Sequence, residues 1–165
     1  MSSYNDNITF DKNNIIFNFR VAGIVLNRGR LLLHTTAYDD FWNLPGGRVK
    51  FNETTEASLI REFEEELGVH IEIEQLAYVN EDFFVYNEKK VHEIGFYYVV
   101  RLSENQEITS INEEFKGLED NGKLTFKWFA LEELQDMEVY PTCLKTEVSS
   151  MENMKIIKHH IERQV

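Results

Sequence analysis

Four of the eight residues from Arg61 to Gly68 (REFEEELG) are glutamates. On a helix, residues three and four positions apart are neighbours, so Glu62, Glu65 and Glu66 share one face. The three carboxylates repel one another, and the negative end of the helix dipole disfavours each by about 0.3 to 1 kcal/mol. A hard divalent cation, Mg²⁺ first and Mn²⁺ as the alternative, takes oxygen ligands and would offset this cost. The other interpretation is a solvated acidic face, because most charge runs are simply surface.

The elements that must position these carboxylates are a helix and the loop before it. From Thr54 to Leu67 the apolar residues recur at steps of three and four, which is the periodicity of an amphipathic helix. Gly68 is placed to end that helix, since glycine adopts the left-handed conformation of a C-cap. The segment Phe41–Gly47 (FWNLPGG) contains one proline and two glycines, and therefore predicts a bent loop with exposed backbone.

Strands are predicted where β-branched and aromatic residues gather or alternate with polar ones. These stretches are residues 15–26, 31–34, 69–73, 83–86, 91–102 and 124–129. Residues 1–13 form a polar leader, and residues 103–122 form a long acidic loop. A helical stripe predicts a C-terminal helix through Leu144, Val148, Met151, Met154, Ile157 and Ile161.

Composition limits the partners and the compartment. A chain of 165 residues fits one domain, and we expect residues 1–165 to form it. Lys and Arg total 17 against 29 Asp and Glu, so a nucleic-acid polymer is not expected as a ligand. The apolar runs are too short for a membrane helix, and the first residues lack the features of a secretory signal. With a single cysteine, Cys143, no internal disulfide can form, and a cytoplasmic location is expected.

The spacing around the glutamates resembles a known family signature. The sequence resembles the Nudix box at every defined position, and the residues before the box look like that family's approach to it. The resemblance implies one α/β domain with the Nudix α/β/α sandwich, built from a mixed central sheet, a catalytic loop and helix, and a C-terminal helix. The matching residues are Gly47, Glu53, Arg61, Glu62, Phe63, Glu65, Glu66, Gly68 and Val69, preceded by Trp42, Leu44, Pro45 and Gly46.

The resemblance also implies a reaction and roles for individual residues. Nudix enzymes use a divalent metal to hydrolyse a phosphoanhydride bond in a nucleoside diphosphate linked to another group. By this resemblance the metal ligands are Glu62, Glu65 and Glu66 together with the Gly46 carbonyl. Arg61 would orient the carboxylates, and Glu53 would brace the loop against the helix.

The general base and the substrate contacts stay open at this point. Family members use either a glutamate of the box, here Glu62, or one from a downstream loop. The candidates in the loop are Glu113, Glu114 and Glu119. Arg20 and Arg48 can contact phosphates, since a guanidinium binds them in bidentate fashion, and Gly47 lies beside them in the loop.

The nucleotide itself is not identified by the sequence. Family members that prefer ADP-ribose usually carry a proline some fifteen residues past the box. The only prolines here are Pro45 and Pro141, so a preference for ADP-ribose is disfavoured. Tyr86 lies where diadenosine polyphosphate hydrolases of the family often place a tyrosine, although a hairpin or core role is the favoured explanation. Phe41 or Trp42 could stack on a base or pack beneath the loop. Cys143 and the histidines have no spacing typical of a nucleophile or metal site.

Two other classes of function compete with hydrolysis. A Nudix-like module could bind a nucleotide and regulate without cleaving it, although such modules commonly lose carboxylates of the box. A purely structural acidic helix would leave Gly46, Gly47, Glu53 and Arg61 unexplained. A monomer and a homodimer both remain open.

Overall fold

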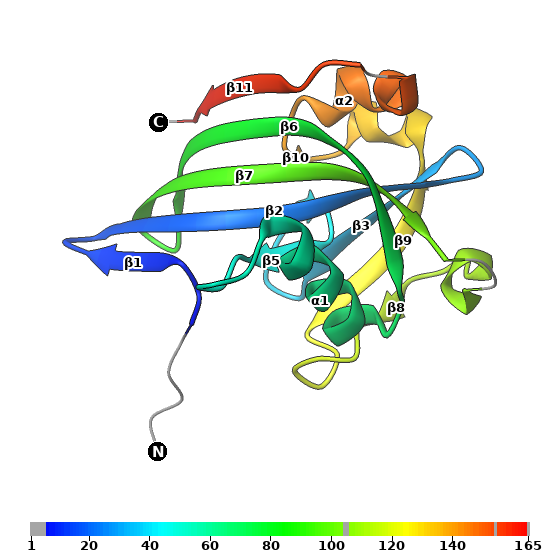
Figure 1. The fold of residues 1–165 in the computed structure, drawn as a ribbon, viewed down its shortest axis with the longest axis horizontal. Helices are drawn as coiled ribbons and strands as arrows, with labels where there is room; N and C mark the ends of the chain where they lie inside the picture. The colour runs from blue at the N-terminus through cyan, green and yellow to red at the C-terminus, as the bar shows by residue number, and fades with distance from the viewer. Residues whose placement is uncertain (1–5, 104–105, 154, 165) are drawn as a thin grey trace.

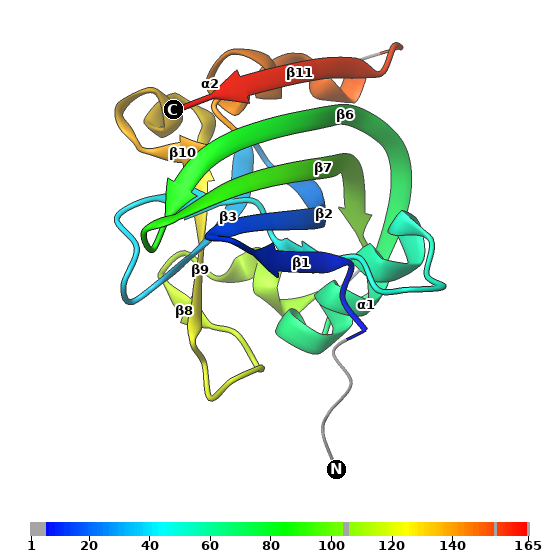
Figure 2. The same cartoon turned by 90° about the vertical axis from the view of Figure 1, so that its left-hand side faces the viewer.

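The computed structural model describes residues 6–103, 106–153 and 155–164. A strongly curved mixed sheet forms the middle layer, with helix α1 (Thr55–Leu67) on one face (Figures 1 and 2). Short helical turns cover the opposite face: η2 (Leu131–Asp136), α2 (Leu144–Glu147) and η3 (Val148–Asn153). The predicted α/β/α sandwich is therefore confirmed, with a second helical layer made of short pieces.

The centre of the sheet consists of three long neighbouring strands, β2, β7 and β6. Its main path runs β10-β4-β3-β2-β7-β6-β11, while β1 and β5 pair with β2, and β9 pairs with β3 and β8. The pairs β2–β7, β4–β10 and β6–β11 are parallel, and the other pairs are antiparallel. The strands are β1 (Thr9–Lys12), β2 (Ile15–Asn27), β3 (Arg30–Thr36), β4 (Trp42–Asn43), β5 (Gly46–Arg48), β6 (Ile71–Tyr86), β7 (Lys89–Leu102), β8 (Phe115–Lys116), β9 (Leu124–Ala130), β10 (Val139–Tyr140) and β11 (Lys158–Arg163).

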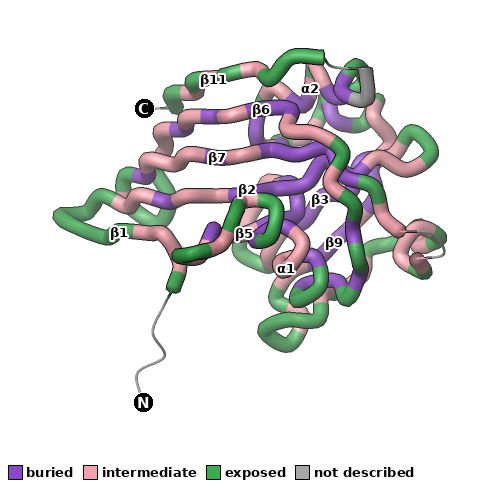
Figure 3. The backbone as a smooth tube through the Cα atoms, in the orientation of Figure 1, coloured by how far each residue is buried: buried purple, intermediate pink, exposed green. Residues whose placement is uncertain are grey.

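Two cores lie on the two faces of this sheet, and strand β2 contributes to both. Val21 and Val25 pack with the α1 side chains Leu59 and Phe63, whereas Ile24 packs toward α2 and η3. Alternate residues of a strand point to opposite faces, so a strand covered on both sides must be apolar throughout. This explains the run VAGIVL, and Figure 3 shows the buried middle of the sheet.

Helix α1 has the boundaries that its sequence predicts. The Thr54 side chain accepts a hydrogen bond from the backbone N–H of Ala57 at 3.1 Å, and Gly68 ends the helix with φ 65°. Leu59, Phe63 and Leu67 are buried against the sheet. These caps and this apolar face fix the position of the helix on the sheet, and with it the positions of its glutamates.

Replacing Thr54 with alanine removes the N-cap acceptor while leaving the buried face of α1 intact. The free energy of unfolding is expected to fall by about 1 kcal/mol, the usual value for such a cap. Chemical denaturation of the two proteins would measure this, with Thr54→Ser as the variant that keeps the cap. Equal stability of Thr54→Ala and the parent would show that the cap contributes nothing.

The long C-terminal helix expected from the apolar stripe is a wrong prediction. Regular α-helix ends at Glu147 and η3 ends at Asn153, after which the chain forms strand β11. Met151 is fully buried, but Ile157 and Ile161 are 60% and 58% exposed; Met154 lies outside the described residues. The physical reason is that the free edge of β6 offers backbone partners, and β11 pairs with it over six residues.

The leader and the acidic loop both contain short elements. Strand β1 lies within residues 1–13 and pairs with the start of β2, while residues 1–5 lie outside the described part. Within residues 103–122 the chain forms η1 (Glu107–Ser110) and β8. Residues 104–105 lie outside the described part of the chain. The predicted strands of residues 15–26, 31–34 and 124–129 are confirmed, and the hairpin around NEKK is confirmed with longer arms.

Candidate active site

A cleft of about 440 Å³ lies between α1, β2, β5 and the turn that follows β8. Its lining carries both signs of charge. The carboxylates are those of Glu62, Glu65, Glu93 and Glu119, and the basic side chains are those of Arg20, Arg48, Lys50 and Arg61. An arrangement of this kind can hold a cation and a phosphate side by side.

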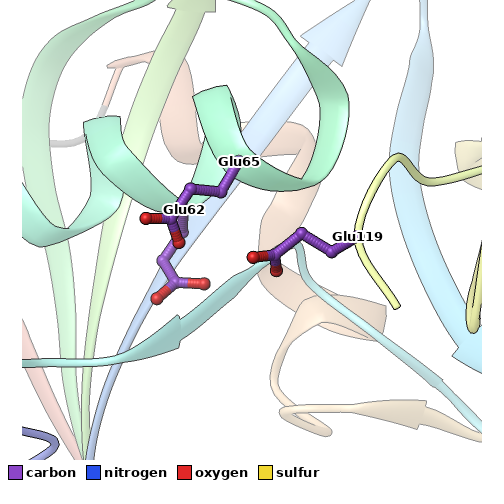
Figure 4. Close-up of side chains that lie close together, drawn as sticks. All are labelled: Glu62, Glu65 and Glu119. Carbon is purple, nitrogen blue, oxygen red and sulfur yellow. The ribbon is translucent and has the colours of Figure 1, made fainter. Parts of the chain in front are cut away.

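Three carboxylates of the cleft converge on one point. Oxygen atoms of Glu62, Glu65 and Glu119 lie within 4.8 Å of one another, and Figure 4 shows two side chains coming from α1 and the third from the turn. The turn is attached to the helix end, because the Leu118 N–H donates to the Glu66 carbonyl at 2.8 Å. The C-terminal end of α1 therefore places its own glutamates and also Glu119.

Arg61 joins the carboxylates of the loop and the helix. Its guanidinium donates to Glu53 at 3.0 Å, to Glu62 at 2.6 Å and to Glu65 at 3.1 Å. A guanidinium presents its donors in a rigid fork, so these bonds fix the three carboxylates relative to one another. This geometry agrees with the orienting role that the family resemblance implies for Arg61.

Glu53 is held on two sides by the helix that follows it. Besides Arg61, it accepts a hydrogen bond from the Ser58 hydroxyl at 2.5 Å. The hydrogen bonds from Arg61, with that of Ser58, lower the pKa of Glu53 to about 2. Glu53 is therefore a permanent anion that braces the loop against α1, and it is not placed to exchange protons near neutral pH.

Glu66 is the most buried acid of the helix, with 7% of its surface exposed. Burial, followed by the negative charge of Glu62, raises its pKa to about 8, against the opposing effect of Arg20. A carboxylate that is costly to charge beside other acids gains most from a bound cation. The donor set is oxygen only, so the residues present fit Mg²⁺ or Mn²⁺.

Each of the two glycines before the helix is required for a steric reason of its own. A Cβ at Gly47 would lie 2.3 Å from the Glu62 carboxyl carbon, so the carboxylate packs directly on the bare backbone. A Cβ at Gly46 would lie 2.1 Å from the Val21 carbonyl oxygen across the β2–β5 pairing. Gly46 is buried, and the part of its carbonyl in metal binding stays a prediction.

Replacing Gly47 with alanine is expected to displace the Glu62 side chain and leave the fold in place. Activity should then fall by at least about tenfold, because misplaced carboxylates no longer form the site. Gly46→Ala is the contrasting variant, since its clash is with strand backbone and should lower the unfolding temperature. Turnover and thermal unfolding of both variants measure this, and full activity of Gly47→Ala would contradict the packing argument.

Arg20 and Arg48 face each other on the paired strands β2 and β5. Arg20 donates to the Leu44 carbonyl at 2.8 Å, and Arg48 donates to the Asn18 side chain at 3.1 Å. Both also line the cleft that the carboxylates line. The two guanidinium groups are thus held in place by the loop and the sheet, where they can contact a phosphate.

A second cavity of about 320 Å³ continues from the first, and the two share Asn18, Arg20, Arg48 and Glu93. Five aromatic residues line it: Phe41, Phe84, Tyr86, Tyr97 and Tyr140. The Phe41 ring meets Tyr140 edge-on with centroids 5.4 Å apart, and the Tyr86 hydroxyl donates to Asp39 at 3.1 Å. Tyr86 and Phe41 therefore line a cavity that continues from the cleft.

Several sequence candidates lie elsewhere. Glu113 and Glu114 are exposed and belong to neither cavity lining, unlike Glu119. Trp42 packs edge-on against Phe129 with ring centroids 4.7 Å apart, so its role is packing. Burial raises the pKa of the Cys143 thiol to about 12, which keeps it protonated and unreactive.

His34 also has a structural place. Its Nε2 lies 3.1 Å from the Leu44 carbonyl, so the ring supports the same loop that Arg20 contacts. Burial, with the charge of Arg20, lowers the pKa of His34 to about 3. The ring is therefore neutral at physiological pH, and it stiffens the loop before α1 without adding charge.

Sequence reasoning missed the polar residues on the sheet beneath both cavities. Asn18 on β2 and Glu93 on β7 are register partners, and Asp82 on β6 is the partner of Glu93. The available signal was a polar residue at every second position of an otherwise apolar strand, as with Asn18 and Arg20 in IIFNFRVAGIVL.

Comparison with known proteins agrees with this geometry. The family model described as NUDIX domain matches residues 17–145. A MutT-like protein of Streptomyces ambofaciens is 42% identical over 57 residues, covering 34% of this chain and 37% of that protein. An 8-oxo-dGTP diphosphatase of Proteus vulgaris is 48% identical over 31 residues, covering 19% of this chain and 28% of that protein. The matched segments thus span about a third of these curated relatives.

Solved structures support the same fold. A NUDIX hydrolase from Nitrosomonas europaea superposes with a TM-score of 0.60 at 19% identity, over 89% of this chain and 79% of that one. Within the described residues, no helix is long and apolar enough to cross a membrane. The family match covers the loop, helix α1 and the strands that build the cleft, and the chain belongs to the NUDIX domain family.

Proposed function

We propose that this protein is a metal-dependent pyrophosphohydrolase that splits a phosphoanhydride bond in a nucleoside diphosphate linked to another group. The observation that carries the proposal is the meeting of Glu62, Glu65 and Glu119 opposite Arg20 and Arg48 in one cleft. Acids alone would repel a diphosphate, and arginines alone would only bind it. Their combination suits hydrolysis.

The chain's own groups divide the work between binding and proton transfer. Glu62, Glu65 and Glu66, with the Gly46 carbonyl, would hold Mg²⁺, and Mn²⁺ is the alternative ion. The bound ion supplies charge neutralisation of the diphosphate and a lower pKa for bound water. Arg61 holds Glu62 and Glu65 in place before substrate arrives.

The carboxylate of Glu119 is the better-placed general base. Glu62 receives a 2.6 Å hydrogen bond from Arg61, which holds its carboxylate in place as a metal ligand. Burial, together with the charges of Glu65 and Glu62, raises the pKa of Glu119. A raised pKa brings a carboxylate closer to the value that suits proton transfer near neutrality.

A substrate panel tests the proposal directly. The protein is incubated with nucleoside di- and triphosphates, dinucleoside polyphosphates and nucleotide sugars, with Mg²⁺ or with EDTA, and released phosphate or pyrophosphate is measured. Hydrolysis with Mg²⁺ that EDTA abolishes is the expected result. Binding of these nucleotides without hydrolysis of any of them would instead make the protein a nucleotide-binding module.

A further inference from the structure

The second cavity has a polar wall that lies partly outside the family match. Strand β11 pairs in parallel with β6 at the edge of the sheet (Figure 2), beyond residue 145. After β11 the chain stays attached, since the Gln164 N–H donates to the Phe83 carbonyl at 2.9 Å. The side chain of Gln164 reaches into the cavity lining, where its Nε2 lies 3.5 Å from Asp82 Oδ1.

Asp82 is the buried carboxylate of this wall, with 7% of its surface exposed. It lies between two other acids in one row across the sheet, because Glu162 of β11 and Glu93 of β7 are its register partners. Like charges that face each other across strands are destabilising. Burial, followed by Glu162 and Glu93, raises the pKa of Asp82 to about 7. Such a carboxylate is stabilised by N–H donors of a ligand.

The cavity therefore has three chemically distinct parts. Arg20 and Arg48 belong to the lining that it shares with the metal cleft, and the rest of its lining includes aromatic rings and the polar pair of Asp82 and Gln164. Aromatic rings beside a few placed polar groups are how proteins hold and read a nucleobase. Its volume, about 320 Å³, is within the range of small-ligand sites.

We propose that the base of the substrate binds in this cavity, and that Asp82 and Gln164 select a guanine-type edge. Guanine presents two adjacent N–H donors, at N1 and N2, which match the two oxygens of one carboxylate. Its O6 is an acceptor for the Gln164 amide. Adenine places an acceptor at N1, which at pH 8 would face the ionised carboxylate of Asp82 without a proton between them. This inference rests on the proposed function for the placement of the phosphates.

Binding of nucleoside monophosphates tests the inference without hydrolysis. Calorimetric titration at pH 8 with GMP, IMP and AMP is expected to show GMP binding at least about tenfold more tightly than IMP, which lacks only the N2 amine. AMP should bind more weakly than GMP by a similar factor. Equal affinity for GMP and IMP would overturn the proposal.

Two variants separate the roles of the two side chains. Asp82→Asn keeps the size, removes one acceptor oxygen, and should bring the GMP to IMP affinity ratio close to one. Gln164→Ala should weaken GMP and IMP equally, because both carry O6, and should leave AMP unchanged. Glu81→Gln is the matched control, since Glu81 is the neighbour of Asp82 on β6 but lines neither cavity and contacts His159, and it should keep the ratio of the parent.

The outcome for the base and the outcome for hydrolysis are independent. Hydrolysis of all four nucleoside triphosphates at equal kcat/KM would leave the proposed function in place and overturn the base assignment. A GMP preference that depends on Asp82, in a protein that hydrolyses nothing in the panel, would support the base assignment and reject the hydrolase. Thermal unfolding of Asp82→Asn shows whether a change in the GMP to IMP affinity ratio comes from altered recognition or from an unfolded protein. A change that comes only from unfolding counts against the proposal.

Discussion

Replacing Glu66 with glutamine is expected to lower kcat by about 10²- to 10³-fold, the usual loss when one charged group of a preorganised site is removed. Glutamine matches glutamate in size, so the buried position stays filled. It cannot carry the negative charge that a cation requires. Because the surface of Glu66 is only 7% exposed, no mobile surface group can take its place. Steady-state hydrolysis of the best substrate of the panel measures the change.

Glu64→Gln provides the matched control for this result. Glu64 lies in the same helix, but its side chain is 56% exposed and its carboxylate contacts His70 at 3.3 Å, away from the cleft. We expect its kcat to stay within about twofold of the parent, as for surface substitutions in general. If Glu66→Gln keeps near-normal turnover, or if Glu64→Gln loses as much activity, the assignment of the helix face is wrong.

The parts of the fold predicted from the sequence are those whose signals are local. Helix α1 could be bounded because its cap residues, Thr54 and Gly68, lie directly beside its apolar stripe. Likewise, Glu53, Arg61 and the glutamates of the box fall within one loop and one helix, where spacing in sequence fixes spacing in space. The sequence also predicts Arg20 and Arg48 near the cleft, and the long-range pairing of β2 with β5 brings them together there.

The parts that could not be predicted depend on contacts between distant segments. Glu119 joins Glu62 only because the turn after β8 is anchored to the end of α1, and nothing local distinguishes it from Glu113 and Glu114. The wrong C-terminal helix has the same cause. Apolar spacing near Ile157 fits a helix, but the open edge of β6 determines the structure, and that edge is invisible in the segment itself.

Stability of the metal-free protein is expected to fall as the pH rises from about 5 to about 8, which is opposite to the usual behaviour of carboxylates. The pKa of Glu66 is raised to about 8 in the folded protein, so the folded state holds its proton more tightly than the unfolded state does. The free energy of unfolding then decreases as the pH rises from the pKa of Glu66 in the unfolded state to its pKa in the folded state. Glu53, whose pKa is lowered to about 2, is charged in both states throughout this window and adds no slope. His34, whose pKa is lowered to about 3, makes stability rise with pH up to about 6.5. Glu66 and Asp82 together outweigh this one opposing group.

Added Mg²⁺ should reverse this trend, because a cation binds the charged form of the cluster and stabilises only the folded state. The expected result is a small rise in unfolding temperature near pH 5 and a much larger one near pH 8. Calorimetry with EDTA and with millimolar Mg²⁺ at the two pH values measures both effects.

The variant Glu66→Gln isolates the contribution of this one residue. Asp82, with its pKa raised to about 7, also makes stability fall as the pH rises, and it does so equally in the parent and in the variant. The difference between the two proteins therefore reports Glu66 alone. The variant should be at least as stable as the parent near pH 8 in EDTA, and it should gain less from Mg²⁺. An equal gain in both proteins would mean that the ion binds elsewhere, and the buried charge of α1 would then need another partner.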